Sequence, residues 1–184
     1  MLGLLLLLAG GSLWLLRQTA LQAVLGERTK THEPDYYFTD ATVTSMGVDG
    51  QPASELKSPR ILHHPDDDST ESFDPRMRYF IKHGMPWYVQ SDHAVSPSGN
   101  HWVYLDGHVQ ITHPSATGGP PLVIVTDKMV VNLDTNVAST DDPVQMDQGK
   151  NHTQGVGMDA YLNDNRLVLR TAVRGHYVTQ QTQH

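Results

Sequence analysis

The chain has 184 residues, no cysteine, and 20 acidic against 13 basic residues, for a net charge of −7. This acidic balance argues against a nucleic-acid partner and against attraction to anionic lipid surfaces. An apolar N-terminus and a short linker leave about 145 residues, enough for one domain of ordinary size. The lack of cysteine fits either redox compartment and decides nothing about location.

The N-terminal 25 residues are the most apolar part of the chain. Leu2 to Leu16 carry no charge, and these fifteen residues cover roughly 22 Å as a helix. A bilayer core is about 30 Å thick, so a full span continues through Arg17 to Leu25. We predict a transmembrane helix over residues 1–25 and a charged linker over residues 26–35.

A cleaved signal peptide is the alternative for this segment. Signal peptides have a basic n-region and an A-x-A-like cleavage site. No Lys or Arg precedes Arg17, and Ala20-Leu21-Gln22-Ala23 matches such a site poorly. An uncleaved anchor is therefore favoured, although the positive-inside rule has almost nothing to count at this N-terminus.

The same segment has features of a helix that contacts other membrane helices. The Arg17 side chain either snorkels to the interface or meets a polar group of a partner helix. Small residues let helix backbones approach closely, although a true GxxxG motif is missing. The candidate partner contacts in this segment are Ala9, Gly10, Ser12, Trp14 and Arg17.

Beyond Asp35, short β-type runs are separated by turn signals every eight to twelve residues, as in sandwiches and barrels. We predict strands over 36–46, 53–64 (broken at Pro59), 72–82, 87–95, 101–111 (bent at Asp106-Gly107), 122–133 (kinked at 126–128), a short strand around 144–146, and a hairpin of 154–162 with 166–178. The result is an all-β domain over residues 36–178 and a polar tail over 179–184.

Alternating apolar residues give each predicted strand one face directed to the interior. The seven methionines suit an adaptable apolar surface and hint at a ligand groove. The residues expected to face inward are Val43, Leu56, Ile61, Phe73, Met77, Tyr79, Trp87, Val89, Trp102, Tyr104, Val109, Ile111, Val123, Val125, Met129, Val131, Val144, Met146, Met158, Leu167, Leu169 and Val173.

Eleven histidines raise the question of a metal or catalytic site, but their spacing does not support one. The adjacent His63 and His64 would point to opposite faces of a strand. Asp66-Asp67-Asp68 lacks the spacing and the following Glu of an EF-hand, so we interpret it as a solvated acidic turn. G-x-S-x-G and cysteine nucleophiles are missing. We predict no catalytic residues, no metal site and no cofactor.

A series of short motifs runs along the predicted strands. It comprises Tyr36-Tyr37 with the Asp49-Gly50 turn, His63-His64-Pro65 through Thr70-Glu71 to Pro75, Gly84-Met85-Pro86-Trp87, Leu105-Asp106-Gly107-His108-Val109-Gln110-Ile111, Thr126, Thr140 with Pro143-Val144, Gly155-Val156-Gly157-Met158, and Val173-Arg174-Gly175-His176-Tyr177. Each motif is weak alone. Their order behind a single N-terminal anchor resembles the LptC family of the lipopolysaccharide exporter. The N-terminus departs from the family in having no basic cluster.

The resemblance implies a twisted β-jellyroll of two antiparallel sheets, OstA-like, held by a single-pass anchor in the inner membrane with the domain in the periplasm. Family members receive lipopolysaccharide from an ABC transporter complex (LptB, LptF, LptG) and pass it to the bridge protein LptA. The anchor packs on the transporter and modulates its ATPase. The exposed first and last strands would join neighbouring jellyrolls edge to edge.

On this interpretation, acyl chains lie against inward apolar residues, and partners meet the terminal strands. The lipid-binding candidates are Val43, Phe73, Met77, Tyr79, Val89, Tyr104, Ile111, Val125, Met129, Val131, Met146, Met158 and Leu169; the partner-binding candidates in the domain are Tyr36, Gly50, Arg174 and Tyr177. Two alternatives stay open. One is an anchored carbohydrate-binding or scaffold sandwich, with Trp87 and Trp102 stacking on sugar. The other is a metal-dependent jellyroll enzyme.

Overall fold

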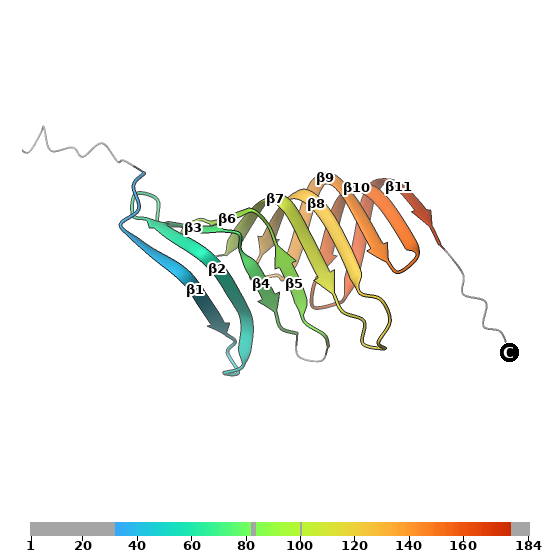
Figure 1. Cartoon of the computed structure of the whole chain (residues 1–184), viewed down its shortest axis with the longest axis horizontal. Helices are drawn as coiled ribbons and strands as arrows, with labels where there is room; N and C mark the ends of the chain where they lie inside the picture. The colour runs from blue at the N-terminus through green and yellow to red at the C-terminus, as the bar shows by residue number, and fades with distance from the viewer. Residues whose placement is uncertain (1–31, 82–83, 100, 178–184) are drawn as a thin grey trace, which may run out of the picture. The chain divides into compact units, whose positions relative to one another are not determined.

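A computed structural model describes residues 32–81, 84–99 and 101–177 of the chain (Figure 1). The chain divides into two units at Glu33 and Pro34, and the fold described here is that of the second unit. The predicted anchor (residues 1–25), most of the linker and the predicted tail (179–184) lie outside the described residues. Within the described ranges, no helix is long and apolar enough to cross a membrane.

The described residues form eleven strands and no helix, which confirms the all-β prediction. The strands are β1 (Tyr36–Met46), β2 (Pro52–His64), β3 (Ser69–Phe73), β4 (Arg76–Tyr79), β5 (Trp87–Gln90), β6 (His93–Ser96), β7 (Trp102–His113), β8 (Leu122–Asn132), β9 (Val137–Gln148), β10 (Asn151–Tyr161) and β11 (Arg166–His176).

Every strand pair is antiparallel, and the long strands each belong to two layers. The first half of β2 pairs with β4, whereas its second half pairs with β3. In the same way β7 pairs with β6 through its first half and with β5 through its second. The β3–β6 pair and the β4–β5 pair therefore lie in different layers of one folded sheet (Figure 1), as in a jellyroll.

The long strands bend where they pass from one layer to the other, and we call this line the elbow. The pairing of β7 with β8 shifts between Asp106 and Val109, which confirms the bend predicted at Asp106-Gly107. Gly107 has a φ of 75°, and a Cβ at this position would lie 2.5 Å from Oδ2 of Asp92. Glycine is therefore required at this corner for both its conformation and its size.

Prolines mark the elbow in other strands. β2 runs unbroken through Pro59, contrary to the predicted break, because the β1 ladder pairs Ser58 and Arg60 and needs no N–H from the residue between them. Pro75 instead lies in the break between β3 and β4, so the single strand predicted over 72–82 is two strands. The strand predicted over 87–95 is likewise divided into β5 and β6, and β9 is much longer than predicted.

The apolar core fills the space between the layers from β5 to β10. Its fully buried large side chains include Trp87, Ile111, Ile124, Met129 and Met158. Close packing of such side chains supplies most of the stability of an all-β domain. The core does not reach β1, since Ala41 is its one residue that is not exposed.

Four inward assignments on the two long strands are wrong by one residue: Trp102 and Tyr104 on β7, and Val123 and Val125 on β8. In β7 the buried residues are Val103 and Leu105, whereas Tyr104 is 46% exposed and Trp102 is exposed as well. In β8 Ile124 is buried and Val125 is 40% exposed. The cause is the elbow. On β7 the inward residues have odd numbers on both sides of the bend, whereas on β8 they have even numbers before the bend and odd numbers after it. The alternation of apolar residues in the sequence predicts a change of numbering on β7 and no change on β8.

Phe73 is also wrongly assigned to the inward face. It pairs with Arg60 on β2 and His93 on β6, in a row that continues to Asp106 on β7, so its side chain faces outward. Its ring lies 5.2 Å from the His93 ring, and the Arg60 guanidinium lies 5.4 Å from its centroid. The phenylalanine therefore packs against polar side chains in a row on the outer face.

Candidate functional site: an apolar trough between two strand edges

A row of apolar side chains crosses seven strands on the face between the layers. Directly paired residues of neighbouring strands share a face of the sheet, so the pairing defines the row. Its members, from β1 through β2, β4, β5, β7 and β8 to β9, are Val43, Leu56, Met77, Val89, Ile111, Ile124 and Met146. We call this the long row.

A second row lines the facing layer. Its members, from β1 through β2, β3, β6 and β7 to β8, are Phe38, Ile61, Ser72, Ala94, Leu105 and Met129. Thr140, Met158 and Leu169 are paired in the same manner on β9, β10 and β11. The two layers thus present apolar rows to each other over most of the domain.

The side chains of both rows become more exposed toward β1. Ile111 in the middle of the long row is 1% exposed, whereas Val43 at its β1 end is 48% exposed. The second row behaves alike, because Ile61 is buried and Phe38 is exposed. The space between the layers is therefore packed in the middle and accessible at β1. We call this accessible apolar surface, with the two rows behind it, the trough.

Ten of the thirteen lipid-binding candidates face between the layers, and three do not. The inward ones are Val43, Met77, Tyr79, Val89, Ile111, Met129, Val131, Met146, Met158 and Leu169; those facing outward are Phe73, Tyr104 and Val125.

Trp87 on β5 and His113 on β7 bring two buried polar ring atoms to the inner face of the sheet. Their rings stack with centroids 4.1 Å apart and an interplanar angle of 16°. Within the described residues, neither Nε1 of Trp87 nor Nδ1 of His113 has a hydrogen-bond partner, although both atoms are buried. Desolvation lowers the pKa of His113, so its imidazole is neutral at physiological pH. Sequence reasoning missed His113, because a histidine at a strand end gives no local signal.

The described part of the sheet has two free edges, one on β1 and one on β11. Asp40 is the only charged residue of β1, which begins with three aromatic residues. β11 has Arg166, Arg170 and Arg174 and no acidic residue. An unpaired edge of eleven residues is a template for strand addition, and the different charges suit different partners.

The structure places the partner-binding candidates of the domain at these two edges. Tyr36 begins β1, and Gly50 lies in the β1–β2 turn with a φ of 74°. Arg174 lies on β11 opposite Gln154, and Tyr177 directly follows this strand. The candidates Ala9, Gly10, Ser12, Trp14 and Arg17 lie outside the described residues.

A histidine holds the start of β1 against β2. Nδ1 of His63 lies 2.8 Å from Oδ1 of Asp35, and its Nε2 lies 3.0 Å from Oδ1 of Asp68. The Tyr36 ring stacks on His63 at 4.5 Å. The hydrogen bonds to Asp35 and then to Asp68 raise the pKa of His63, and the histidine lowers the pKa of both carboxyl groups. We call Asp35, His63 and Asp68 the clasp.

An arginine holds β11 onto the sheet at the other edge. The Arg170 guanidinium donates to Asp159 with its Nε at 2.9 Å and also pairs with Asp141. The hydrogen bond to Asp159 raises the pKa of Arg170, and the same contact lowers the pKa of Asp159. Both edge strands are thus fastened to the sheet by ionic groups.

A family model described as lipopolysaccharide-assembly, LptC-related, matches residues 2–178 of the chain. The chain belongs to the LptC family. The resemblance read from the ordered motifs is therefore confirmed. Members of this family are periplasmic components of lipopolysaccharide transport that are anchored in the inner membrane. No curated protein matches the chain.

Proposed function

We propose that this LptC-family chain is a single-pass inner-membrane protein that receives lipopolysaccharide from an ABC transporter and passes it along a bridge of jellyrolls. LptB, LptF and LptG would form the transporter, and LptA would be the next module. The single observation that carries the proposal is the long row. It leads from the packed core to an exposed valine on a free strand edge.

In this mechanism the trough takes the acyl chains while the sugars stay in water. Burying a few hundred Å² of acyl chain is worth several kcal/mol at about 25 cal/mol per Å². Such an affinity holds lipid without trapping it, provided that the next module offers a similar apolar surface. Transfer is then driven by the transporter behind it, and this domain needs no nucleotide.

The two free edges give the bridge its continuity. A jellyroll that adds a strand to β1 or β11 would extend the sheet by main-chain hydrogen bonds. The partner's apolar interior would then continue the trough beyond Val43 or Leu169. We further propose that the predicted helix over residues 1–25 contacts the transporter in the membrane and modulates its ATPase.

Only one of the two tryptophans required by the carbohydrate-binding alternative is accessible at the surface. Trp87 is 2% exposed and stacked on His113, so it offers no face to a sugar at the surface. Trp102 is exposed, as the alternative requires. A single exposed tryptophan is weaker support than a continuous apolar row.

Site-specific photocrosslinking tests the lipid proposal, with Val43 and its neighbour Thr44 as a matched pair. Val43 faces the trough and Thr44 the outer face, and both are exposed. A photoreactive residue at 43 should capture lipopolysaccharide only when ATP and the transporter are present. Equal capture at positions 43 and 44, or capture at neither position with an active transporter, would refute the proposal.

A further inference from the structure

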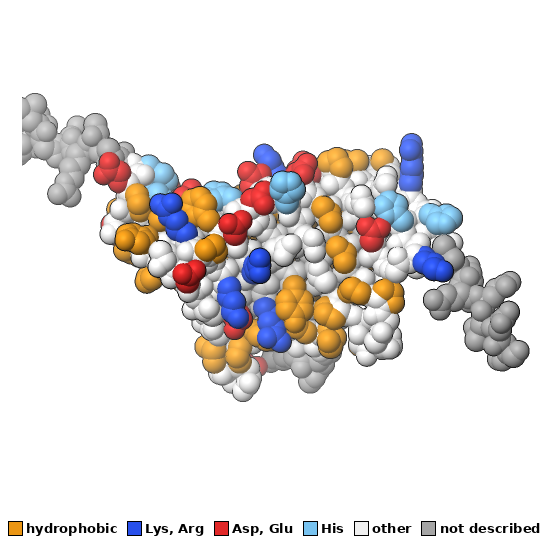
Figure 2. Space-filling model, in the orientation of Figure 1, with side chains coloured by type: hydrophobic (Ala, Val, Ile, Leu, Met, Phe, Trp, Pro, Cys, Tyr) orange, Lys and Arg blue, Asp and Glu red, His pale blue; other side chains and the backbone are white. Residues whose placement is uncertain are grey.

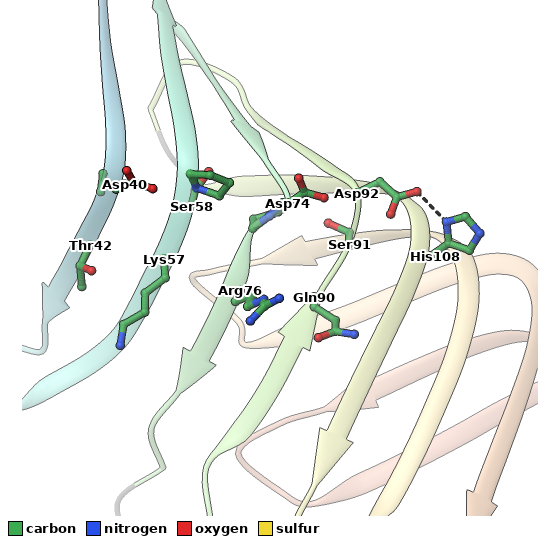
Figure 3. Close-up of a pocket in the computed structure, with 13 residues that line it drawn as sticks. Asp40, Thr42, Lys57, Ser58, Asp74, Arg76, Gln90, Ser91, Asp92 and His108 are labelled. Carbon is green, nitrogen blue, oxygen red and sulfur yellow. Dashed lines mark hydrogen bonds and ion pairs between the residues drawn. The ribbon is translucent and has the colours of Figure 1, made fainter.

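A polar groove lies at the elbow, on the outer face of β1, β2, β4 and β5 (Figure 3). Its volume is about 610 Å³, within the range of small-molecule sites. Residues from five strands, β1, β2, β4, β5 and β7, and from the β3–β4 and β5–β6 connections line it, so it exists only in the folded sheet. We call it the elbow groove.

The elbow groove and the trough lie on opposite faces of the sheet. Thr42, Lys57, Arg76 and Gln90 are paired across β1, β2, β4 and β5 and form one wall of the groove. Each of them is adjacent in sequence to a member of the long row. Because successive residues of a strand point to opposite faces, the groove is separate from the proposed acyl site.

Two cations stand directly opposite each other in this wall. Lys57 pairs with Arg76 in the β2–β4 ladder, and like charges in this arrangement destabilise a sheet. Nζ of Lys57 lies 3.2 Å from Oε1 of Glu55, whereas Arg76 has no hydrogen bond or ion pair within the described residues. Figure 2 shows basic side chains gathered over β2 and β4 on a chain whose net charge is −7. These two charges do not stabilise the fold, but they would stabilise a bound anion.

Three carboxylates line the other end of the groove. Figure 3 shows Asp40, Asp74 and Asp92 along the elbow, with Lys57 and Arg76 further down the strands. Nδ1 of His108 lies 2.6 Å from Oδ2 of Asp92, and this contact raises the pKa of His108. Asp40 and Asp74 have no side-chain partner within the described residues. Free carboxylates repel an anion and accept hydrogen bonds from hydroxyl groups.

We propose that the elbow groove binds a sugar that carries a phosphate or carboxylate group, namely the glycan part of the transported lipid. The fork of Arg76 and the ammonium of Lys57 would take the anionic group. Asp40 and Asp74 would accept hydrogen bonds from sugar hydroxyls, and Gln90 can donate or accept. The opposite charges at the two ends fix the direction in which the sugar lies.

The chemistry of the groove separates this ligand from its competitors. The carboxylates disfavour an anionic membrane surface, and a flat bilayer does not enter a groove. Inorganic phosphate would use the cationic end alone and leave Asp40 and Asp74 without partners. The assignment of the sugar to lipopolysaccharide rests on the proposed function, whereas the sugar chemistry of the groove does not.

The test is a calorimetric titration of the full chain in detergent micelles with lipopolysaccharide oligosaccharide from which all acyl chains have been removed. Arg76→Gln and Lys57→Gln should each weaken binding by about tenfold or more, the loss expected for one charge-assisted hydrogen bond. Lys128→Gln makes the same charge change on β8, away from the groove, and should bind like the parent chain. Asp74→Asn should weaken the oligosaccharide but not inorganic phosphate.

Three results would overturn the inference: binding unaffected by Arg76→Gln and Lys57→Gln, equal loss in Lys128→Gln, or an oligosaccharide no better bound than inorganic phosphate. Arg76-dependent binding to anionic vesicles without oligosaccharide binding would assign the groove to a membrane instead. Crosslinking of lipopolysaccharide at position 43 without Arg76-dependent oligosaccharide binding refutes the groove alone. Oligosaccharide binding in the groove without any crosslink at 43 refutes the proposed function alone.

Discussion

Val43 on β1 and Leu56 on β2 are directly paired, so an exposed valine at a sheet edge shares its face with the buried core. This pairing gives the trough an accessible end. Without it, the apolar rows would be the interior of an ordinary sandwich. The accessible end is what a lipid that enters and leaves requires.

A charge at this end should block lipid loading without unfolding the domain. We expect Val43→Asp to reduce lipopolysaccharide captured from the active transporter several-fold, because an acyl chain would have to desolvate the carboxylate. Thermal unfolding should change little, since Val43 is exposed. Thr44→Asp is the matched control on the outer face, outside the elbow groove, and equal loss in both variants would argue against the trough.

Gly107 should be intolerant of any side chain. Gly107→Ala places a methyl group against Asp92 at a φ of 75°, and we expect a loss of about 1–3 kcal/mol in the free energy of unfolding. Gly118 also has a φ of 75° but no atom within 4 Å of its would-be Cβ. Gly118→Ala therefore carries the conformational cost alone. Equal losses in denaturant titrations would show that crowding at the elbow contributes nothing.

The clasp should make the start of β1 sensitive to pH. The pKa of His63 is raised in the folded state, so its stabilising contribution is complete below about pH 6.5 and is lost as the pH rises through the folded-state pKa. The pKa values of Asp35 and Asp68 are lowered, so their contribution is present above about pH 4 and is lost in stronger acid.

We therefore expect hydrogen exchange of the β1 amides near Tyr36 to quicken from pH 6 to pH 8 by more than the intrinsic rate. His63→Gln should remove this extra pH dependence. His101→Gln, which breaks a comparable exposed pair with Asp134, should leave it intact. An unchanged profile in His63→Gln would assign the effect to another group.

Arg170 should hold the β11 edge in place for a partner. Arg170→Gln breaks the pairs with Asp159 and Asp141, and we expect faster hydrogen exchange in β11 and weaker capture of the neighbouring jellyroll. Arg166→Gln removes the same charge at the start of the strand, where the guanidinium stacks on Tyr161. If both variants lose the partner equally, the charge of the edge matters and the geometry held by Arg170 does not.

Arg17 distinguishes a simple anchor from a docking helix. A simple anchor should tolerate Arg17→Leu or insert better, because an intramembrane charge is costly. A docking helix should lose co-purification with the transporter or change its ATPase rate. Normal association and ATPase activity in Arg17→Leu would show that the side chain only snorkels.

Local chemistry was enough for most of the long strands and the turns between them, but not for the division of two predicted strands into β3 with β4 and β5 with β6, nor for the length of β9. Tyr36–Met46 is a strand with the predicted bounds, and the bends at Asp106-Gly107 and at residues 126–128 fall where glycine and polar residues interrupt apolar runs. The ordered motifs were enough for the family. These features depend on short segments, so they can be predicted from the sequence directly.

The faces of the long strands could not be predicted so well. Alternation predicts which face a residue occupies only while the strand is regular. The bend at the elbow takes up a number of residues that the sequence does not reveal, so the predicted face can be wrong on one side of the bend. Tyr104 and Val125 were placed inward for this reason, and both are exposed. Phe73 was placed inward because it alternates with Met77 and Tyr79 in one predicted strand. That strand is divided at Pro75, and the cross-strand partners Arg60 and His93 put Phe73 outside.

The sequence by itself determined an all-β domain, its strand order along the chain and its family. Only the tertiary structure decided that Val43 continues the core row to a free edge, and that Lys57 and Arg76 face each other beside Asp74. The physical reason is the range of the interactions. Turn and strand propensities act over a few residues, whereas cross-strand pairing joins residues far apart and fixes which of them share a face.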